Sequence, residues 1–92
     1  MRFTWNSRKA AQNRKKHGVS FEEAITVFSD RTAVIFDDDK HSDDEYREFI
    51  IGFSQQSRLL VIFFVERDNT IRIISARRAT QIETTNHEKA KR

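Results

Sequence analysis

The 92-residue sequence contains no cysteine and no proline, and it has only two glycines. Without cysteine there is neither a disulfide nor a thiolate metal site, which fits a reducing compartment. Without proline there is no proline-rich linker to mark a domain boundary. Gly18 and Gly52 alone are too few for a glycine-rich phosphate loop, which excludes nucleotide hydrolysis through a P-loop.

Long apolar runs are absent as well. The longest, residues 59–65, is too short to span a bilayer, and the first residues lack the apolar run of a signal peptide. The length suits a single sheet with a few helices. We therefore expect one domain over residues 1–92, a cytoplasmic location and no membrane contact.

Charge is unevenly distributed along the chain. Residues 1–17 carry six lysines and arginines and no acid, whereas residues 31–48 carry three bases and seven acids. A basic segment attracts phosphate backbones, and an acidic segment either meets a basic partner or keeps a face solvated. The pattern favours a polyanionic ligand, although a basic first helix is more often an ordinary solvated face.

Periodicity predicts an α+β fold with the element order β-α-α-β-β-β-β-α. Because short turns join the last four strands, we expect an antiparallel sheet, with two N-terminal helices packed on one face and a C-terminal helix. Asp68-Asn69 is typical of a compact hairpin turn. The expected elements are a strand around residues 3–5, helices over 7–17 and 21–28, strands at 33–36, 47–53, 59–65 and 71–76, and a helix after Thr80.

The stretch from Lys16 to Ala24 combines folding signals with ionisable side chains. Gly18 can adopt the positive φ that ends a helix, and Ser20 with Glu23 has the spacing of a capping box, in which the Glu23 carboxylate returns to the Ser20 amide. A firm corner then holds Lys16 and His17 in the last turn of the first helix. His17 can transfer protons near neutral pH, but a cationic histidine at a helix end also simply stabilises the helix dipole.

Four arginines, Arg67, Arg72, Arg77 and Arg78, gather on the last hairpin and just beyond it. The two strand ends are expected to bring Arg67 and Arg77 close together. Guanidinium groups there can clamp a phosphodiester and stabilise its extra transition-state charge. The alternative for each arginine is an ion pair with Glu48, Glu66 or the acidic loop.

The acidic loop superficially resembles a calcium site, but strands flank it and Ser42 replaces the turn glycine, so an EF-hand is rejected. Magnesium binding through a few of its carboxylates stays open, with a solvated loop as the default. His17, His41 and His87 lack zinc spacing. We expect no metal and no cofactor. The loop's candidate ligands are Asp37, Asp39, His41, Asp43, Glu45 and Glu48.

Two blocks of sequence resemble the BrnT family of toxins from type II toxin–antitoxin systems. One is the stretch from Lys16 to Ala24, and the other runs from Arg72 to Ala79. Members of that family are small RelE-like ribonucleases that arrest translation by cutting RNA, so the resemblance implies a RelE-like fold and endoribonuclease activity. Further matching positions are Phe3, Trp5, Lys9, Asn13, Val27, Phe28, Arg47, Ile51 and Gly52, so the resemblance covers nearly the whole chain.

The resemblance also implies a metal-independent mechanism. In RelE-type cleavage the RNA 2′-hydroxyl attacks its own phosphorus, a base takes that proton, an acid protonates the departing 5′-oxygen, and cations stabilise the phosphorane. The match places Lys16 and His17 in a Lys-His-Gly block, Arg77 in a Ser-Ala-Arg block, and Arg67 at the basic position that closes the preceding strand. We expect His17 to act as acid or base with assistance from Lys16, and Arg67 and Arg77 to stabilise charge.

Other basic residues are expected to bind the RNA backbone, namely Arg14, Lys15 and Arg78. Two positions depart from the family pattern. Asn6 replaces an aspartate, which should mainly alter a helix cap, and His87 stands near a usual tyrosine in the last helix. We therefore hold His87 as a further candidate for RNA contact.

The resemblance implies a BrnA-like antitoxin with a ribbon-helix-helix DNA-binding part as partner. DNA is then contacted only indirectly, through a complex that represses its own promoter, and a dimer of toxin–antitoxin heterodimers is one expected assembly. Two alternatives stay open. The chain is a non-catalytic RNA- or protein-binding domain on the same scaffold, or its last helix and acidic loop serve protein interaction alone.

Overall fold

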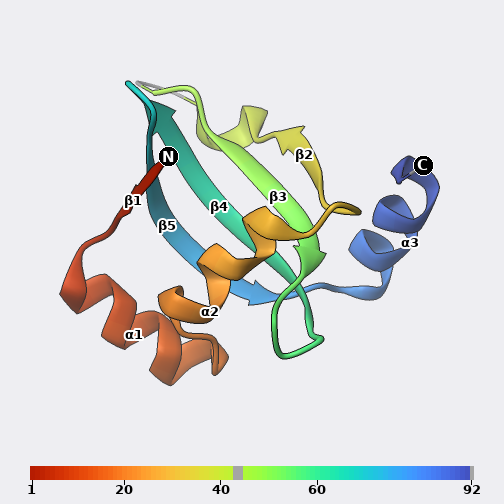
Figure 1. Cartoon of the computed structure of the whole chain (residues 1–92), viewed down its shortest axis with the longest axis horizontal. Coiled ribbons are helices and arrows are strands. Elements are labelled where there is room, and N and C mark those ends of the chain that lie inside the picture. The colour runs from red at the N-terminus through yellow and green to blue at the C-terminus, as the bar shows by residue number, and fades with distance from the viewer. Residues whose placement is uncertain (43–44, 92) are drawn as a thin grey trace.

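A computed structural model describes residues 1–42 and 45–91. The fold is α+β, with three α-helices and a five-stranded sheet (Figure 1). Two short 3-10 turns, η1 (Val27–Ser29) and η2 (Asp39–His41), flank the second strand. The other elements are β1 (Arg2–Thr4), α1 (Ser7–His17), α2 (Phe21–Thr26), β2 (Val34–Asp37), β3 (Glu48–Phe53), β4 (Leu59–Arg67), β5 (Thr70–Arg78) and α3 (Gln81–Ala90).

The sheet is mixed, with the strand order β1-β5-β4-β3-β2. Strands β2 to β5 form the expected antiparallel meander, and the β4–β5 turn places Asp68 and Asn69 at φ 53° and 62°, as a tight hairpin turn requires. The expectation of a wholly antiparallel sheet is wrong at β1, which pairs with β5 in parallel. No turn joins these two strands, so the hairpin rule does not set their relative direction.

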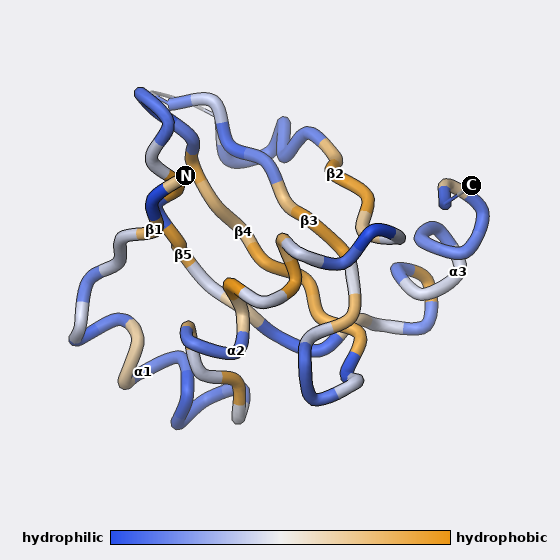
Figure 2. The backbone as a smooth tube through the Cα atoms, viewed as in Figure 1, coloured by the Kyte–Doolittle hydropathy of each residue, from blue (hydrophilic) through white to orange (hydrophobic). Residues whose placement is uncertain are grey.

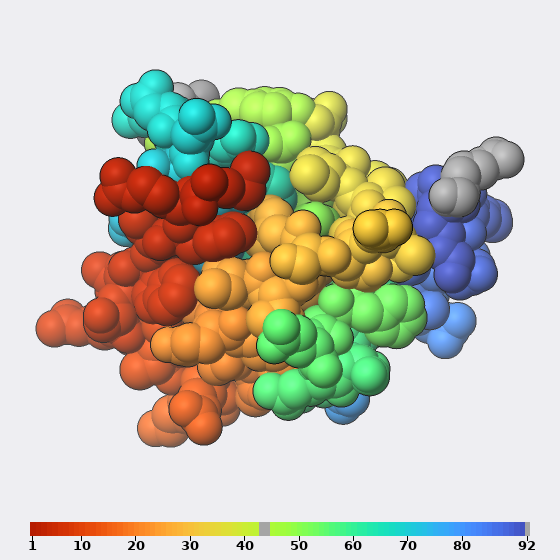
Figure 3. Space-filling view, viewed as in Figure 1, coloured from red at the N-terminus to blue at the C-terminus, as the bar shows by residue number. Residues whose placement is uncertain are grey.

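Helices α1 and α2 lie on one face of the sheet, as expected (Figure 1), and the residues of these segments cover much of the near surface in Figure 3. The core contains Phe21, Ala24 and Val27 from the α2 segment, packed against Ile62 and Phe64 of β4. Figure 2 shows the apolar character concentrated in β3 and β4, whereas α1 and α3 are mostly hydrophilic. The two polar helices therefore need anchors other than apolar burial.

Asn13 is the anchor of α1. Its side-chain amide donates to the carbonyls of Val19 (3.0 Å) and Ala76 (2.8 Å), and its Oδ1 accepts from the Ala76 amide at 3.1 Å. It thereby satisfies both backbone groups of Ala76 on the edge of β5, beyond the three residues that β1 covers. Asn13 is buried, so the weakly apolar helix α1 is held by these hydrogen bonds in addition to the packing of Ala10 against the core.

The corner between α1 and α2 is firm, but it is built differently from a capping box. Gly18 ends α1 at φ 69°, and Ser20 accepts from the Glu23 amide as predicted. The predicted return of the Glu23 carboxylate to the Ser20 amide is wrong. That carboxylate instead accepts from the Arg58 guanidinium and from the Ser54 hydroxyl (2.6 Å). A buried carboxylate is better compensated by a guanidinium than by one backbone amide.

The spacing of Thr80 and Glu83 predicts a capping box at the start of the last helix, and the structure confirms it. Thr80 accepts from the Glu83 amide, and the Glu83 carboxylate accepts from the Thr80 amide. The other end of α3 is anchored by His87, whose Nε2 lies 2.8 Å from the Thr32 carbonyl and whose ring meets Phe53 edge-on. None of the helices in the described part of the chain has the length and apolar character needed to cross a bilayer.

Candidate active site

The candidate site centres on a bulge in β5, on the face of the sheet opposite the core. Phe63 pairs with Ser75 and Phe64 pairs with Ile73, so Ile74 is an extra residue in β5. Two shallow depressions, of about 270 and 180 Å³, both include Ile74 and Ser75 in their lining. Bulges often re-aim side chains at functional sites. We call these depressions together the Ser75 groove.

The first depression lies between Ser75 and α1. Its α1 lining includes Lys9, Gln12, Lys16 and His17, which lie on either side of the Asn13 anchor. His17 is the last residue of α1 and is half-buried. Asn13 therefore fixes the rotation of α1 that presents Lys16 and His17 to the edge of β5. The sequence predicted that these two residues would be held in place at the end of this helix.

Arg77 lies on the same face, two residues beyond Ser75. Its guanidinium donates two hydrogen bonds to Glu83 (2.7 and 2.8 Å) and one to the Arg78 carbonyl, and it stands 5.6 Å over the Phe63 ring. These contacts use three of its five N–H donors and fix its plane. The hydrogen bonds from Arg77 lower the pKa of Glu83 despite partial burial, and those to Glu83 raise the pKa of Arg77.

Arg77 lies over the last ring of a row of three phenylalanines. Phe36, Phe49 and Phe63 pair across β2, β3 and β4, with ring centroids 5.2 and 5.4 Å apart. The row ends at Ser75, the register partner of Phe63. It gives the groove a stiff apolar floor, in which a phosphate contact to Arg77 is less screened than in open water.

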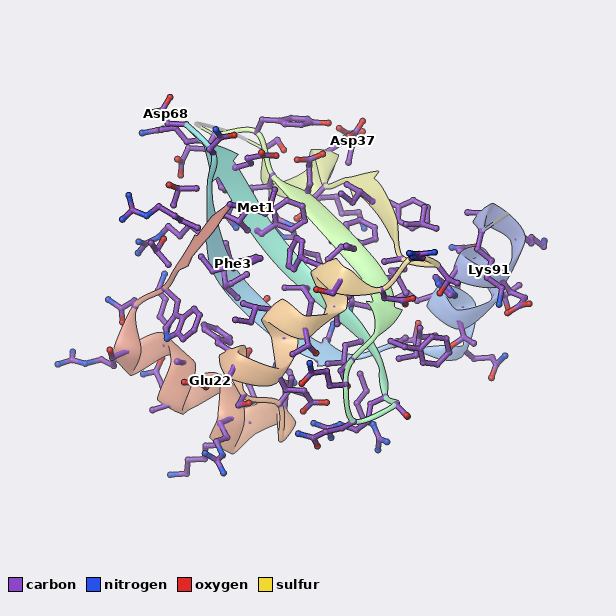
Figure 4. All side chains as sticks on the ribbon, in the orientation of Figure 1. Met1, Phe3, Glu22, Asp37, Asp68 and Lys91 are labelled. Atoms are coloured by element: carbon purple, nitrogen blue, oxygen red, sulfur yellow. The ribbon has the colours of Figure 1, made fainter. Side chains whose placement is uncertain are left out.

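The expected convergence of Arg67 and Arg77 is wrong. Arg67 pairs with Thr70 beside the hairpin turn, whereas Arg77 pairs with Val61, six residues along β4 and roughly 20 Å away. Figure 4 labels Asp68 at that turn, on the opposite side of the molecule from Lys91 in the α3 segment. Arg67 instead forms a 3.0 Å ion pair with Glu45, one of the acidic-loop partners considered for it.

The residues expected to bind the RNA backbone lie around α1 but outside the Ser75 groove. Arg14 and Lys15 line a larger depression between α1 and α2, of about 390 Å³, beside Glu22. Arg78 is exposed at the end of β5, and its charge helps to lower the pKa of Glu23 after the larger effect of the Arg58 hydrogen bonds. Arg14 and Lys15 form a second basic surface next to the groove.

His87 does not fit its expected role in RNA contact. Only 1 % of the residue is exposed, and its Nε2 is engaged by the Thr32 carbonyl. The ring of His87 instead holds α3 against the segment that precedes β2. We therefore leave His87 out of the site.

The acidic loop offers no assembled cation site in the part that is described. Within residues 1–42 and 45–91, no three His, Asp or Glu side chains are grouped to hold a metal ion. Asp43, one of the candidate ligands, lies outside the described residues. Asp38 is buried and pairs with His41.

Sequence reasoning missed the structural importance of Asn13, Ser75 and Glu83. Asn13 gave one signal, because a polar residue midway along a helix with few apolar residues has to be paired if it faces the core. The spacing of Glu83 from Thr80 predicted a capping box, but it did not indicate that the same carboxylate binds Arg77. The signal of Ser75 was its place in the Ser-Ala-Arg block, and the bulge that exposes it depends on the register of two strands.

Comparison with known protein families shows to which family the chain belongs. A sequence profile described as the ribonuclease toxin BrnT of type II toxin–antitoxin systems matches residues 5–83. The chain belongs to this family. The match includes Asn13, Lys16, His17, Ser75 and Arg77, and it ends at Glu83, the carboxylate that holds Arg77. The BrnT family is one of ribonuclease toxins, each paired with an antitoxin.

A solved BrnT structure has the same fold. The ribonuclease toxin BrnT of Brucella abortus superposes with a TM-score of 0.67 at 23 % sequence identity, covering 88 % of this chain and 99 % of that one. Comparison with curated protein sequences gives no significant match.

The Arg77–Glu83 pair makes stability depend on acid pH. The pKa of Glu83 is lowered in the folded state, so its contribution is complete above the unfolded value of about 4.3 and is lost as pH falls through the folded value. We expect the free energy of unfolding of the wild type to fall below about pH 4.5, and Glu83→Gln to reduce this slope. Urea unfolding followed by the fluorescence of Trp5, the single tryptophan, measures both.

Glu88→Gln is the matched control, since it makes the same change on the exposed side of α3. Its slope should equal that of the wild type. Glu23 has a lowered pKa too, and Glu48 has one that burial and the charges of Glu66 and Asp37 raise. Glu23 and Glu48 are present in both variants, so their contributions cancel in the comparison. If the free energy of unfolding depended on pH equally in Glu83→Gln and Glu88→Gln, the assignment to Glu83 would be contradicted.

Proposed function

We propose that this chain is a metal-independent endoribonuclease that cleaves RNA by attack of the 2′-hydroxyl on the adjacent phosphorus. The observation that carries the proposal is the grouping of Lys16, His17 and Arg77 around Ser75. His17 supplies an imidazole for proton transfer, and Arg77 supplies unused N–H donors for the phosphorane. Lys16 adds positive charge beside His17.

The RNA follows the basic surfaces on both sides of α1. Arg14, Lys15 and Arg78 lie where they can hold phosphates upstream or downstream of the groove, and contacts of this kind position the strand without reading its sequence. Arg67, at the other end of the β4–β5 hairpin, has no part in the cleavage step. Its remaining role is a distant phosphate contact in competition with Glu45.

In the cell, the proposed activity is translation inhibition in the cytoplasm, neutralised by a BrnA-like antitoxin. The membership in a toxin–antitoxin family supports this part of the proposal. Contact with DNA is then indirect, through the ribbon-helix-helix part of the antitoxin in an assembly such as a dimer of heterodimers. Growth arrest on expression, relieved by the product of the adjacent reading frame, is the expected phenotype.

The direct test is cleavage of purified RNA in the presence of EDTA. We expect fragments with 2′,3′-cyclic phosphate and 5′-hydroxyl ends, because the 2′-oxygen becomes bonded to phosphorus as the 5′-oxygen leaves. End-group analysis by phosphatase and kinase treatment identifies them. Salt-dependent RNA binding without cleavage would support the non-catalytic RNA-binding alternative, and weak, salt-insensitive binding would support a purely protein-binding role.

A further inference from the structure

A second histidine borders the Ser75 groove from the side opposite α1. His41 ends the η2 turn, and its Nδ1 lies 3.1 Å from each carboxylate oxygen of Asp38. Asp38 is buried, whereas 61 % of the His41 side chain is exposed. A carboxylate only accepts hydrogen bonds, so Nδ1 is the donor and Nε2 is directed away from Asp38, available to take or give a proton.

The backbone around His41 is fixed rather than loose. The Ser42 hydroxyl donates to the Asp38 carbonyl (2.8 Å) and accepts from the Arg47 amide (2.9 Å). The Asp38 amide donates to the Arg47 carbonyl at 2.9 Å, which closes the loop where β3 begins. Hydrogen-bonded support of this kind is what a proton-transfer group requires.

His41 and His17 border the same stretch of β5. The smaller depression of the groove is lined by Asp38, His41, Arg47 and Phe63 together with Ile74 and Ser75, and the larger one by Lys16 and His17 with the same two β5 residues. Arg47 and Arg77 add positive charge on the His41 side, where Arg77 stands over Phe63. The Ser75 groove is therefore bordered by an imidazole on each of its two sides.

The chemistry of 2′-hydroxyl attack requires two such groups. The O2′–P bond forms as the P–O5′ bond breaks, in line and on opposite sides of phosphorus. The O2′ proton passes to a neutral base, and a different, protonated group gives a proton to O5′. One imidazole cannot hold both states in a single step, whereas two can, and the proton count is conserved.

Building on the proposed function, we propose that His41, oriented by Asp38, is the second proton-transfer residue of the RNA-cleaving site and acts opposite His17. Asp38 is a positioning residue. It selects the Nδ1–H form and leaves Nε2 for the RNA, as carboxylates do for catalytic histidines in other enzymes. The pair His41–Asp38 is thus more than an ion pair within a loop.

The test is single-turnover cleavage of RNA between pH 5 and 9, comparing the wild type with His41→Asn. The asparagine amide still donates to Asp38 but lacks Nε2. We expect a bell-shaped profile for the wild type, and for His41→Asn a rate lower by about 100-fold or more with one limb of the bell missing. Asp38→Asn should shift that limb and lower the rate less. The charged groups lining the depression beside His41 are Asp38 and Arg47, so Arg47→Gln is profiled alongside.

Lys40→Gln, an exposed change in the same turn, is the control and should cleave like the wild type. Circular dichroism and Trp5 fluorescence establish that the variants are folded, and His41→Gln replaces His41→Asn if the latter unfolds. A wild-type rate with both limbs intact in a folded His41 variant overturns the role of His41 while leaving the ribonuclease proposal standing. No cleavage by the wild type itself overturns both.

Discussion

Asn13→Asp is expected to lower the free energy of unfolding by about 3–5 kcal/mol, the largest effect of any single change considered for this chain. The substitution replaces the amide donor that binds the Val19 and Ala76 carbonyls with an oxygen. Each buried backbone group left without a partner costs about 1–3 kcal/mol, and a carboxylate facing two carbonyls adds repulsion. Because small domains are stable by only about 5–15 kcal/mol, the variant should be partly unfolded at 37 °C.

Gln12→Glu is the matched control. It makes the same amide-to-acid change at the neighbouring helix position, where the side chain is exposed, and should alter stability by no more than about 0.5 kcal/mol. Thermal unfolding followed by circular dichroism compares the two, and Asn13→Asp should melt more than about 12 °C lower. Equal melting temperatures would show that α1 is held by something other than Asn13.

The second large effect is expected in catalysis. His17→Asn should lower single-turnover RNA cleavage by about 100- to 10,000-fold without changing the fold, because it removes the proposed proton-transfer group from the end of α1 and leaves the Asn13 anchor intact. Cleavage of a short labelled RNA, with substrate binding measured separately, distinguishes a lost chemical step from lost affinity. Lys89→Gln, an exposed change on α3, is the control for altered net charge.

Arg77→Lys provides the partner substitution for a double-mutant cycle with His17→Asn. Lysine keeps the charge but lacks the planar fork that binds Glu83 and spreads over Phe63, so we expect a loss of about 100-fold. If both residues act on one phosphate, the double variant should lose less than the product of the two single losses. Full multiplicativity, or normal growth arrest by the folded double variant, would argue against a shared site.

Local signals in the sequence were sufficient for most of the secondary structure. Gly18, Ser20 and Thr80 mark helix ends through backbone and hydroxyl chemistry that acts within four residues, and Asp68-Asn69 sets a hairpin in the same way. Gly18, Thr80 and the Asp68-Asn69 turn behave as predicted, and Ser20 caps its helix although the Glu23 carboxylate does not return to it. Lys16 and His17 were placed correctly at the end of α1 because only local geometry was needed.

Contacts between residues far apart in the sequence could not be predicted from these local signals. The parallel pairing of β1 with β5 and the capture of Glu23 by Arg58 both depend on contacts between distant segments. The separation of Arg67 from Arg77 is different, because it follows from the local register of the β4–β5 hairpin. Arg58 lies 35 residues from Glu23, and nothing within the capping-box spacing indicates it. His41 was treated as part of an acidic loop, because its position beside Ser75 follows from the closure of that loop on Arg47.

The pairing of the first strand with the last has a consequence for the newly made protein. β1 finds its partner only when β5 has been synthesised, and the Ala76 edge that Asn13 binds becomes available at the same stage. Sixty residues separate His17 from Arg77, which at 5–20 residues per second is about 3–12 seconds of synthesis. A nascent chain therefore carries the α1 side of the Ser75 groove, with Lys16 and His17, for several seconds before Ser75 and Arg77 have been synthesised.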